Sequence, residues 1–159
     1  MTATRPILFA TDGSPSAEEA QKEAFELAQR LGAPLVVVSV VHAALPAAGY
    51  AGYGYSNIVA ELTEAEHHRV TALLASVAEA ADAEGVHCST VAVDGFAVEE
   101  ICRKASEYDA QLIVVGSHGW GPARRFLSGS VSTGLVHSAP CPVLVVRPRV
   151  QSVEHAAAA

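Results

Sequence analysis

The chain has 159 residues, of which half are hydrophobic and 17% are charged, a balance that indicates a folded globular protein and excludes a disordered or fibrous one. The length fits one domain, which we place at residues 1–150, with a tail at 151–159 that we expect to be disordered. The formal net charge of −7 argues against a nucleic-acid-binding protein, because nonspecific phosphate binding needs a basic face. With no signal-peptide pattern and no apolar run near the roughly 18 residues of a membrane span, we expect a cytoplasmic protein with no membrane partner.

Short β-branched runs alternate with longer segments of helical periodicity along the chain. In chain order, the predicted elements are a strand at 7–11, a helix at 15–31, a strand at 35–41, a helix at 58–83, a strand at 86–93, a helix at 98–107, a strand at 112–115, a helix at 130–137 and a strand at 143–147. The first helix has two candidate caps, Ser14 before a proline or Ser16 in a capping box. The run 35–41 is apolar without alternation, which predicts burial on both faces of a sheet.

The segment 43–57 breaks this pattern, because alanine, glycine and tyrosine fill it. We expect a loop here. Tyr50, Tyr53 and Tyr55 suit stacking on a base or contact with a partner, and a disordered loop is an equal alternative.

The alternation of strands and helices predicts a doubly wound, five-stranded parallel sheet of the α/β class. In such open sheets, ligands bind beyond the carboxyl ends of the strands, where the winding direction reverses. The first predicted strand ends in Thr11 and Asp12, and the fourth leads into Gly116 and Ser117. If these two strands are neighbours, their ends belong to one site.

A glycine-rich stretch connects Gly116 to the predicted helix start at Ser130. Glycines let the backbone approach a ligand closely, and the free amides and dipole of a helix start suit a phosphate group. The hydroxyls of Ser130 and Ser132 add hydrogen bonds to phosphate oxygens. A carboxylate such as Asp12 only accepts hydrogen bonds, so it suits a ribose hydroxyl or a metal ion. These features predict a mononucleotide site, although the P-loop and GxGxxG motifs are absent.

One combination of residues resembles the universal stress protein family in its ATP-binding branch: the spacing Gly116-x2-Gly119-x9-Gly129-Ser130, the early Asp12 and the closing run 141–146. The likeness extends from Arg5 to about Pro148. It implies a Rossmann-like fold, similar to that of the adenine nucleotide alpha hydrolases, with sheet order 3-2-1-4-5. The implied ligand is ATP, alone or with Mg²⁺. The candidate nucleotide-binding residues are Thr11, Asp12, Val41, Gly116, Ser117, Gly119, Arg124, Gly129, Ser130, Val131 and Ser132.

The last predicted strand suggests how two copies of the chain associate. An apolar edge strand such as Val143–Val146 exposes unpaired amides, which invite pairing with a second copy. The resemblance implies the same homodimer, formed by antiparallel pairing of this strand.

Several candidates also have simpler explanations. Asp12 and Gly13 form a common turn pair, and Gly116 and Gly119 are compatible with a role in tight turns alone. Arg124 either neutralises a triphosphate or belongs to a solvated loop pair. The histidines show no metal-ligand spacing, and we expect the three cysteines to be buried small apolar residues.

Three functional hypotheses follow. The first is a non-catalytic, ATP-binding stress-response protein, a dimer whose nucleotide occupancy alters its shape or its partners. The second is a slow ATPase or phosphotransferase, for which only Asp12, His118 and Arg124 are candidates and no general base has an evident partner. We therefore expect little or no turnover and assign no catalytic residue. The third is a nucleotide-free interaction module in which the glycine-rich stretch is only a turn.

Overall fold

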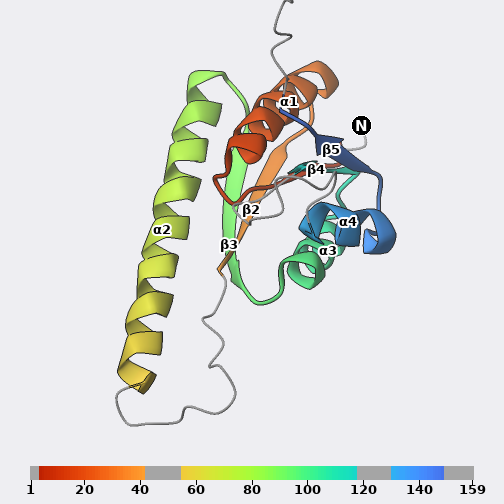
Figure 1. The fold of residues 1–159 in the computed structure, drawn as a ribbon. Helices are drawn as coiled ribbons and strands as arrows, with labels where there is room; N and C mark the ends of the chain where they lie inside the picture. The colour runs from red at the N-terminus through yellow and green to blue at the C-terminus, as the bar shows by residue number, and fades with distance from the viewer. Residues whose placement is uncertain (1–3, 42–54, 118–129, 149–159) are drawn as a thin grey trace, which may run out of the picture.

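The computed structural model describes residues 4–41, 55–117 and 130–148, which form one sheet with helices on both faces (Figure 1). In chain order the elements are β1 (Ile7–Ala10), α1 (Pro15–Leu31), β2 (Leu35–Val41), α2 (Tyr55–Ala83), β3 (Cys88–Asp94), α3 (Ala97–Glu107), β4 (Leu112–Gly116), α4 (Ser130–Ser138) and β5 (Val143–Val146). The predicted α/β class is confirmed. Tyr50, Tyr53 and the tail at 151–159 lie outside the described residues.

The sheet is parallel throughout, with the strand order β3-β2-β1-β4-β5. This is the order 3-2-1-4-5 that the resemblance implied. The chain moves outward from β1 through β2 to β3, and then returns to the other side of β1 to form β4 and β5. The winding direction therefore reverses between β1 and β4, where Ala10 is paired with Val115.

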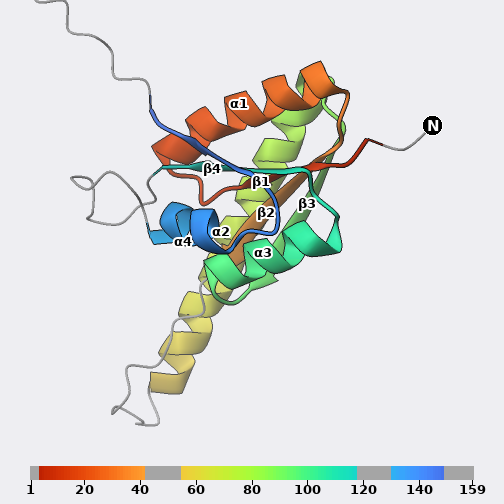
Figure 2. The ribbon, with the colours of Figure 1, turned by 90° about the vertical axis from the view of Figure 1, so that its right-hand side faces the viewer.

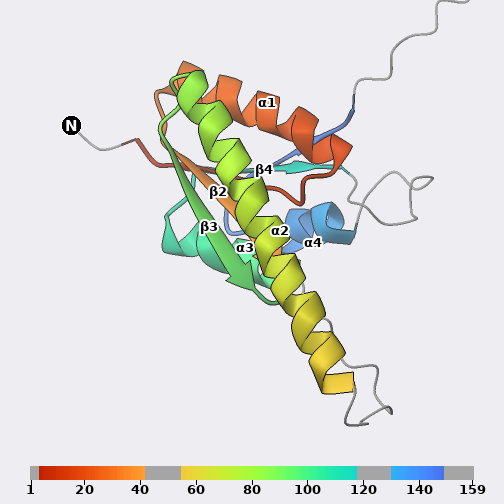
Figure 3. The ribbon, with the colours of Figure 1, turned by 90° about the vertical axis from the view of Figure 1, so that its left-hand side faces the viewer.

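The helices cover the two faces of the sheet in pairs, as Figure 2 and Figure 3 show from opposite sides. α1 and α2 pack on one face, where Phe9 of β1, Phe25 of α1 and Val70 of α2 belong to one buried cluster. α3 and α4 pack on the other face, where Ile101 and Leu135 are buried. Both faces of β2 are covered, and all of its residues are buried, as the apolar run predicted.

Local sequence signals set the ends of α1. Ser14 is the N-cap, because its side chain accepts a hydrogen bond from the Ala17 N–H at 3.3 Å, and Pro15 follows at the first helical position. Of the two predicted caps, the structure selects Ser14. Gly32 ends the helix with a φ of 59°, in the left-handed region that favours glycine.

Some predicted boundaries were wrong. α2 begins at Tyr55 instead of Ile58, so residues 55–57, which were predicted to be loop, belong to the helix. Intrinsic helix propensity is a weak preference, so a long helix tolerates serine and asparagine in its first turn. β3 begins at Cys88 instead of Val86. The Val86 N–H donates to the Ala81 carbonyl oxygen at 2.8 Å, so this residue belongs to the cap of α2.

The edges of the sheet differ from its centre. Among the residues that the structure describes, β5 pairs with β4 alone, and its residues Val143–Val146 are half-buried. The three cysteines were expected to be buried small apolar residues, and the structure shows each of them only partly buried. Within the described residues, no helix combines the length and apolar character needed to cross a bilayer.

Candidate functional site

The carboxyl ends of β1 and β4 are neighbours at the point where the winding reverses. Because Ala10 pairs with Val115, Thr11 and Gly116 are the next residues on adjacent strands. Thr11 is still held as in a strand, since its N–H donates to the Val38 carbonyl oxygen at 3.0 Å. Open α/β sheets bind ligands at such an edge. The two strand ends singled out in the sequence are therefore adjacent.

Asp12 lies in a tight turn between β1 and α1. Its Oδ1 atom accepts a hydrogen bond from the Ser14 N–H at 2.9 Å, and Thr11 Oγ1 accepts one from the Gly13 N–H at 3.2 Å. Gly13 has a φ of 75°, which favours glycine. Asp12 thus has the turn role that an Asp-Gly pair suggests, and this turn lies at the carboxyl end of β1, the strand beside β4.

A side chain from α2 reaches the same turn. Arg69 Nη1 donates to the Asp12 carbonyl oxygen at 3.2 Å. The Nε and Nη2 atoms of Arg69 donate to the two carboxylate oxygens of Glu66 at 2.8 and 2.7 Å. The hydrogen bond to Glu66 and the charges of Glu66 and Asp12 raise the pKa of Arg69, while partial burial lowers it. Arg69 therefore places a permanent positive charge beside Asp12.

Gly116 packs against the first turn of α1. A Cβ atom at this position would lie 2.5 Å from Ser16 Oγ, 2.7 Å from the Ser16 carbonyl carbon and 2.8 Å from the Ala17 nitrogen. Its φ is not positive. The alternative that Gly116 only serves a tight turn is therefore wrong, because close packing between strand and helix requires the glycine.

The start of α4 is attached to the end of β4. The Ser132 hydroxyl donates to the Ser117 carbonyl oxygen at 3.4 Å, and the Ser117 N–H donates to the Val146 carbonyl oxygen at 2.8 Å. Ser117 and Ser132 are buried, whereas Ser130, the first residue of α4, is exposed. The first N–H groups of a helix have no partner within the helix. The structure therefore brings such donors to the carboxyl edge of β4, next to Gly116.

Val41 differs from the other candidates. It is the last residue of β2, and its side chain is fully buried. Its carbonyl oxygen accepts a hydrogen bond from the Gly95 N–H at 3.4 Å. The expected core role of Val41 is confirmed, so any contact with a ligand involves its main chain.

Comparison with known proteins identifies the family. Residues 3–147 match the model of the universal stress protein family. The chain belongs to the universal stress protein family. A putative universal stress protein of Staphylococcus aureus (strain USA300) is 36% identical over 149 residues, which is 92% of this chain and 86% of that protein.

Solved structures of universal stress proteins have the same fold. UspA from Lactobacillus plantarum superimposes with a TM-score of 0.79 at 26% identity, over 92% of this chain and all of the other. A universal stress protein in complex with cAMP gives a TM-score of 0.64 at 26% identity, over 92% of this chain and 98% of the other. The protein from Archaeoglobus fulgidus in complex with dAMP gives 0.57 at 26% identity, over 92% and 99%.

In this universal stress protein, most of the predicted site residues gather at one edge of the sheet. The residues at this edge are Thr11, Asp12, Val41, Gly116, Ser117, Ser130, Val131 and Ser132. Gly119, Arg124 and Gly129 lie outside the described residues. Over the described ranges, no group of three or more histidine, cysteine or acidic side chains is placed to hold a metal ion.

Sequence reasoning missed the contribution of α2. Glu66 and Arg69 are three residues apart, a spacing that predicts an ion pair along a helix but does not show that the pair reaches a strand end. His67, on the same helix, is partly exposed, and its Nε2 atom lies 2.9 Å from Asp94 Oδ1 at the end of β3.

Proposed function

We propose that this universal stress protein binds an adenine nucleotide, with ATP as its ligand, and acts as a non-catalytic, dimeric regulator. The observation that carries the proposal is the juxtaposition of two groups at the winding reversal, the start of α4 and the Asp12 turn. Helix-start amides bind anions, and a carboxylate accepts hydrogen bonds from ribose hydroxyls. Solved family members in complex with cAMP and dAMP support this ligand class.

The residues at this edge have different roles in the proposed binding. The amides of Ser130 and Val131, with the exposed Ser130 hydroxyl, are available to phosphate oxygens at the start of α4. Ser132 instead holds the helix start to β4 through Ser117. Gly119, Arg124 and Gly129 complete the proposed phosphate site on the strength of the motif alone. Asp12 supplies one carboxylate from the turn after β1, so a Mg²⁺ ion that accompanies ATP would be held mainly by phosphates and water.

A slow ATPase is the weaker alternative. Phosphoryl transfer requires a positioned base or an oriented water molecule, together with neutralisation of the developing charge. Asp12 already accepts a hydrogen bond in its own turn, and Arg69, the cation beside it, is engaged by Glu66. This arrangement favours binding over turnover, so the proposal assigns no catalytic residue.

Isothermal titration with ATP tests the proposal through Ser130. Ser130→Glu adds a carboxylate at the first residue of α4, where a negative charge favours the helix but repels phosphate. We expect it to abolish ATP binding while the circular dichroism spectrum and the unfolding temperature are retained. Ser130→Ala is the matched control and should weaken binding only slightly, because the backbone donors remain. Full ATP affinity in Ser130→Glu would place the phosphates elsewhere.

The proposed dimer rests on β5. This edge strand has hydrogen-bonded neighbours on one side only, and its four apolar residues are half-buried in the single chain. Antiparallel pairing with a second copy would cover both the unpaired main-chain groups and this apolar surface. Light scattering should therefore give the mass of a dimer, and a monomer at high micromolar concentration would contradict it.

A further inference from the structure

Side chains of α2 contact the Asp12 turn, the tight turn that joins β1 to α1. Three groups on this helix, at successive turns, reach the end of β1 or each other. Arg69 Nη1 donates to the Asp12 carbonyl oxygen at 3.2 Å. A Cβ atom added at Gly13 would lie 3.2 Å from Leu73 Cδ1 and 3.4 Å from Leu73 Cδ2, so Leu73 packs closely against the turn. Glu66, one turn earlier, binds the guanidinium of Arg69. The turn is thus covered from α2, the long helix in the foreground of Figure 3.

Arg69 and Glu66 are joined by two parallel hydrogen bonds, and this fork determines where the third guanidinium nitrogen points. Both carboxylate oxygens of Glu66 are used, at 2.8 and 2.7 Å. Because a guanidinium group is planar and rigid, two hydrogen bonds fix its plane and leave Nη1 aimed in one direction. That direction leads to the Asp12 carbonyl oxygen, 57 residues away in sequence. The side chain of Glu66 is 24% exposed and that of Arg69 is 44% exposed, so solvent screens the charges of the pair, and its two-point geometry matters more than its energy.

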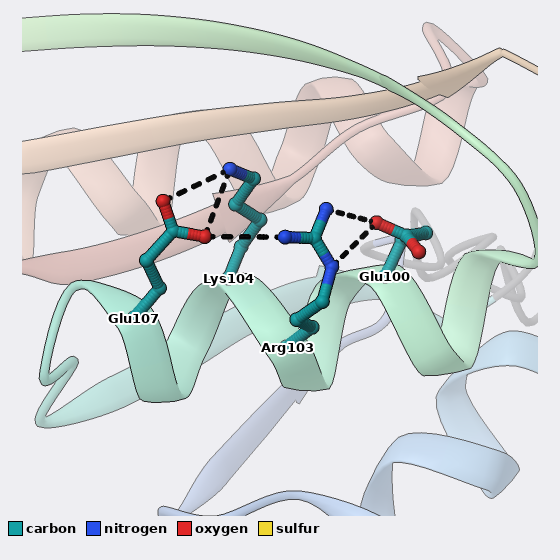
Figure 4. Close-up of polar contacts among 4 residues, drawn as sticks. All are labelled: Glu100, Arg103, Lys104 and Glu107. Carbon is teal, nitrogen blue, oxygen red and sulfur yellow. Dashed lines mark hydrogen bonds and ion pairs between the residues drawn. The ribbon is translucent and has the colours of Figure 1, made fainter.

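Arg103 on α3 forms a similar pair of hydrogen bonds with a glutamate, but its contacts with the described residues stay on its own helix. Arg103 donates through Nε and Nη2 to Glu100, with the same spacing of three residues. Its remaining nitrogen, however, binds Glu107 on the same helix, and Lys104 also binds Glu107 (Figure 4). Within the described residues, the α3 network therefore joins side chains of α3 to one another, whereas Arg69 connects α2 with the end of β1 at the candidate site.

We infer that Arg69, oriented by Glu66, is a positioning residue that holds the Asp12 carboxylate for recognition of the ribose hydroxyls of the nucleotide. This inference rests on the proposed function. A carboxylate that recognises a hydroxyl must be held to within about half an ångström of its binding geometry. The Asp12 side chain and main chain belong to one tight turn, so a contact that fixes the carbonyl also limits the movement of the carboxylate.

The affinities for two nucleotides that differ only in the ribose distinguish a role of Arg69 in ribose recognition from a general effect on the stability of the fold. ATP has the 2′ and 3′ hydroxyls, and 2′,3′-dideoxy-ATP has neither. We expect Arg69→Ala to weaken ATP binding roughly three- to tenfold, as when a charge-assisted hydrogen bond is loosened rather than lost, and to leave dideoxy-ATP binding unchanged. Glu66→Gln keeps Arg69 but disrupts its two hydrogen bonds to Glu66. Like Arg69→Ala, it should therefore lower the ratio of the affinity for ATP to the affinity for 2′,3′-dideoxy-ATP. Arg103→Ala is the matched control and should change neither affinity.

The outcomes distinguish this inference from the proposed function. If the native chain binds neither nucleotide, the proposed function fails and the inference fails with it. If ATP binds and Ser130→Glu abolishes binding, the proposed function stands. An unchanged preference for ATP in Arg69→Ala and Glu66→Gln, or an equal loss for both nucleotides, then overturns only the positioning role of Arg69.

Discussion

Substitution of Gly116 by alanine gives the sharpest test of how β4 packs against α1. The added Cβ atom would lie 2.5 Å from Ser16 Oγ, 2.7 Å from the Ser16 carbonyl carbon and 2.8 Å from the Ala17 nitrogen. Two of these three atoms belong to the backbone of the first turn of α1, and the residues around them are buried. The clash therefore cannot be relieved by rotation of one side chain, and the helix start must move away from the sheet.

The expected cost follows from this geometry. Overpacking a well-packed site costs about 1–3 kcal/mol, and a backbone obstacle places Gly116→Ala near the upper end of that range. The lower chain entropy of alanine in the unfolded state offsets roughly 0.4–1 kcal/mol. We expect the free energy of unfolding to fall by about 2 kcal/mol, which for a chain of this size lowers the unfolding temperature by about 4–8 °C.

Urea unfolding followed by circular dichroism measures this loss, with Gly134→Ala as the matched control. A Cβ atom at Gly134 would lie 2.6 Å from Val98 Cγ2, which is a side-chain atom, and alanine gains about 1 kcal/mol over glycine within a helix. Gly134→Ala should therefore change the free energy of unfolding by less than about 1 kcal/mol. If Gly116→Ala is no more destabilising than Gly134→Ala, the assignment of Gly116 to close packing is refuted.

Three further predictions concern buried polar groups and thiols. Among the described residues, Ser39 Oγ on β2 is buried without a hydrogen-bond partner, so Ser39→Ala should leave urea stability unchanged or raise it by up to about 1 kcal/mol, and a loss of that size would show a hidden partner. Ser14→Ala should cost about 1 kcal/mol in the same assay through loss of the α1 cap, and Ser14→Gly only a few tenths, so equal costs would contradict a capping role. Burial raises the pKa of the Cys88, Cys102 and Cys141 thiols, so iodoacetamide should alkylate the native chain more slowly than free cysteine at pH 8, and faster reaction would refute the shift. The thiol pKa values are higher in the folded state than in the unfolded state. Below the unfolded-state pKa, both states keep their thiols protonated and the thiols do not change the free energy of unfolding. As the pH rises above that value, the unfolded state loses its thiol protons first, so the free energy of unfolding falls.

The elements of the sheet could be predicted because their signals are local. The apolar run at Leu35–Val41 lacks alternation, and the structure covers both faces of that strand. Ser14, Pro15 and Gly32 set the ends of α1 through contacts within a few residues. The same reasoning failed at Val86, where a helix cap and a strand start compete for one residue. Boundaries of this kind depend on which backbone partner a residue has in the folded chain, and composition does not decide that.

Part of the candidate site could also be predicted, because some of its residues have local sequence signals. Asp12 after the first strand and Ser130 at a helix start are sequence features, and the rule for open α/β sheets places strand ends at a ligand-binding edge. Arg69 was not predictable from its own surroundings. Its spacing from Glu66 resembles that of Arg103 from Glu100, yet only Arg69 reaches a strand end.

The sequence by itself determined the alternation of elements, the region where α1 begins and the polar residues at the strand ends, because these depend on backbone preferences and on neighbours within a turn or two. That β4 lies beside β1 was expected only from the family resemblance, and the structure shows it. The tertiary structure alone decided that Gly116 meets the backbone of α1 and that Arg69 reaches Asp12 from α2. These contacts join residues far apart in the chain. They form only when the layers of the fold pack together, so no local pattern specifies them.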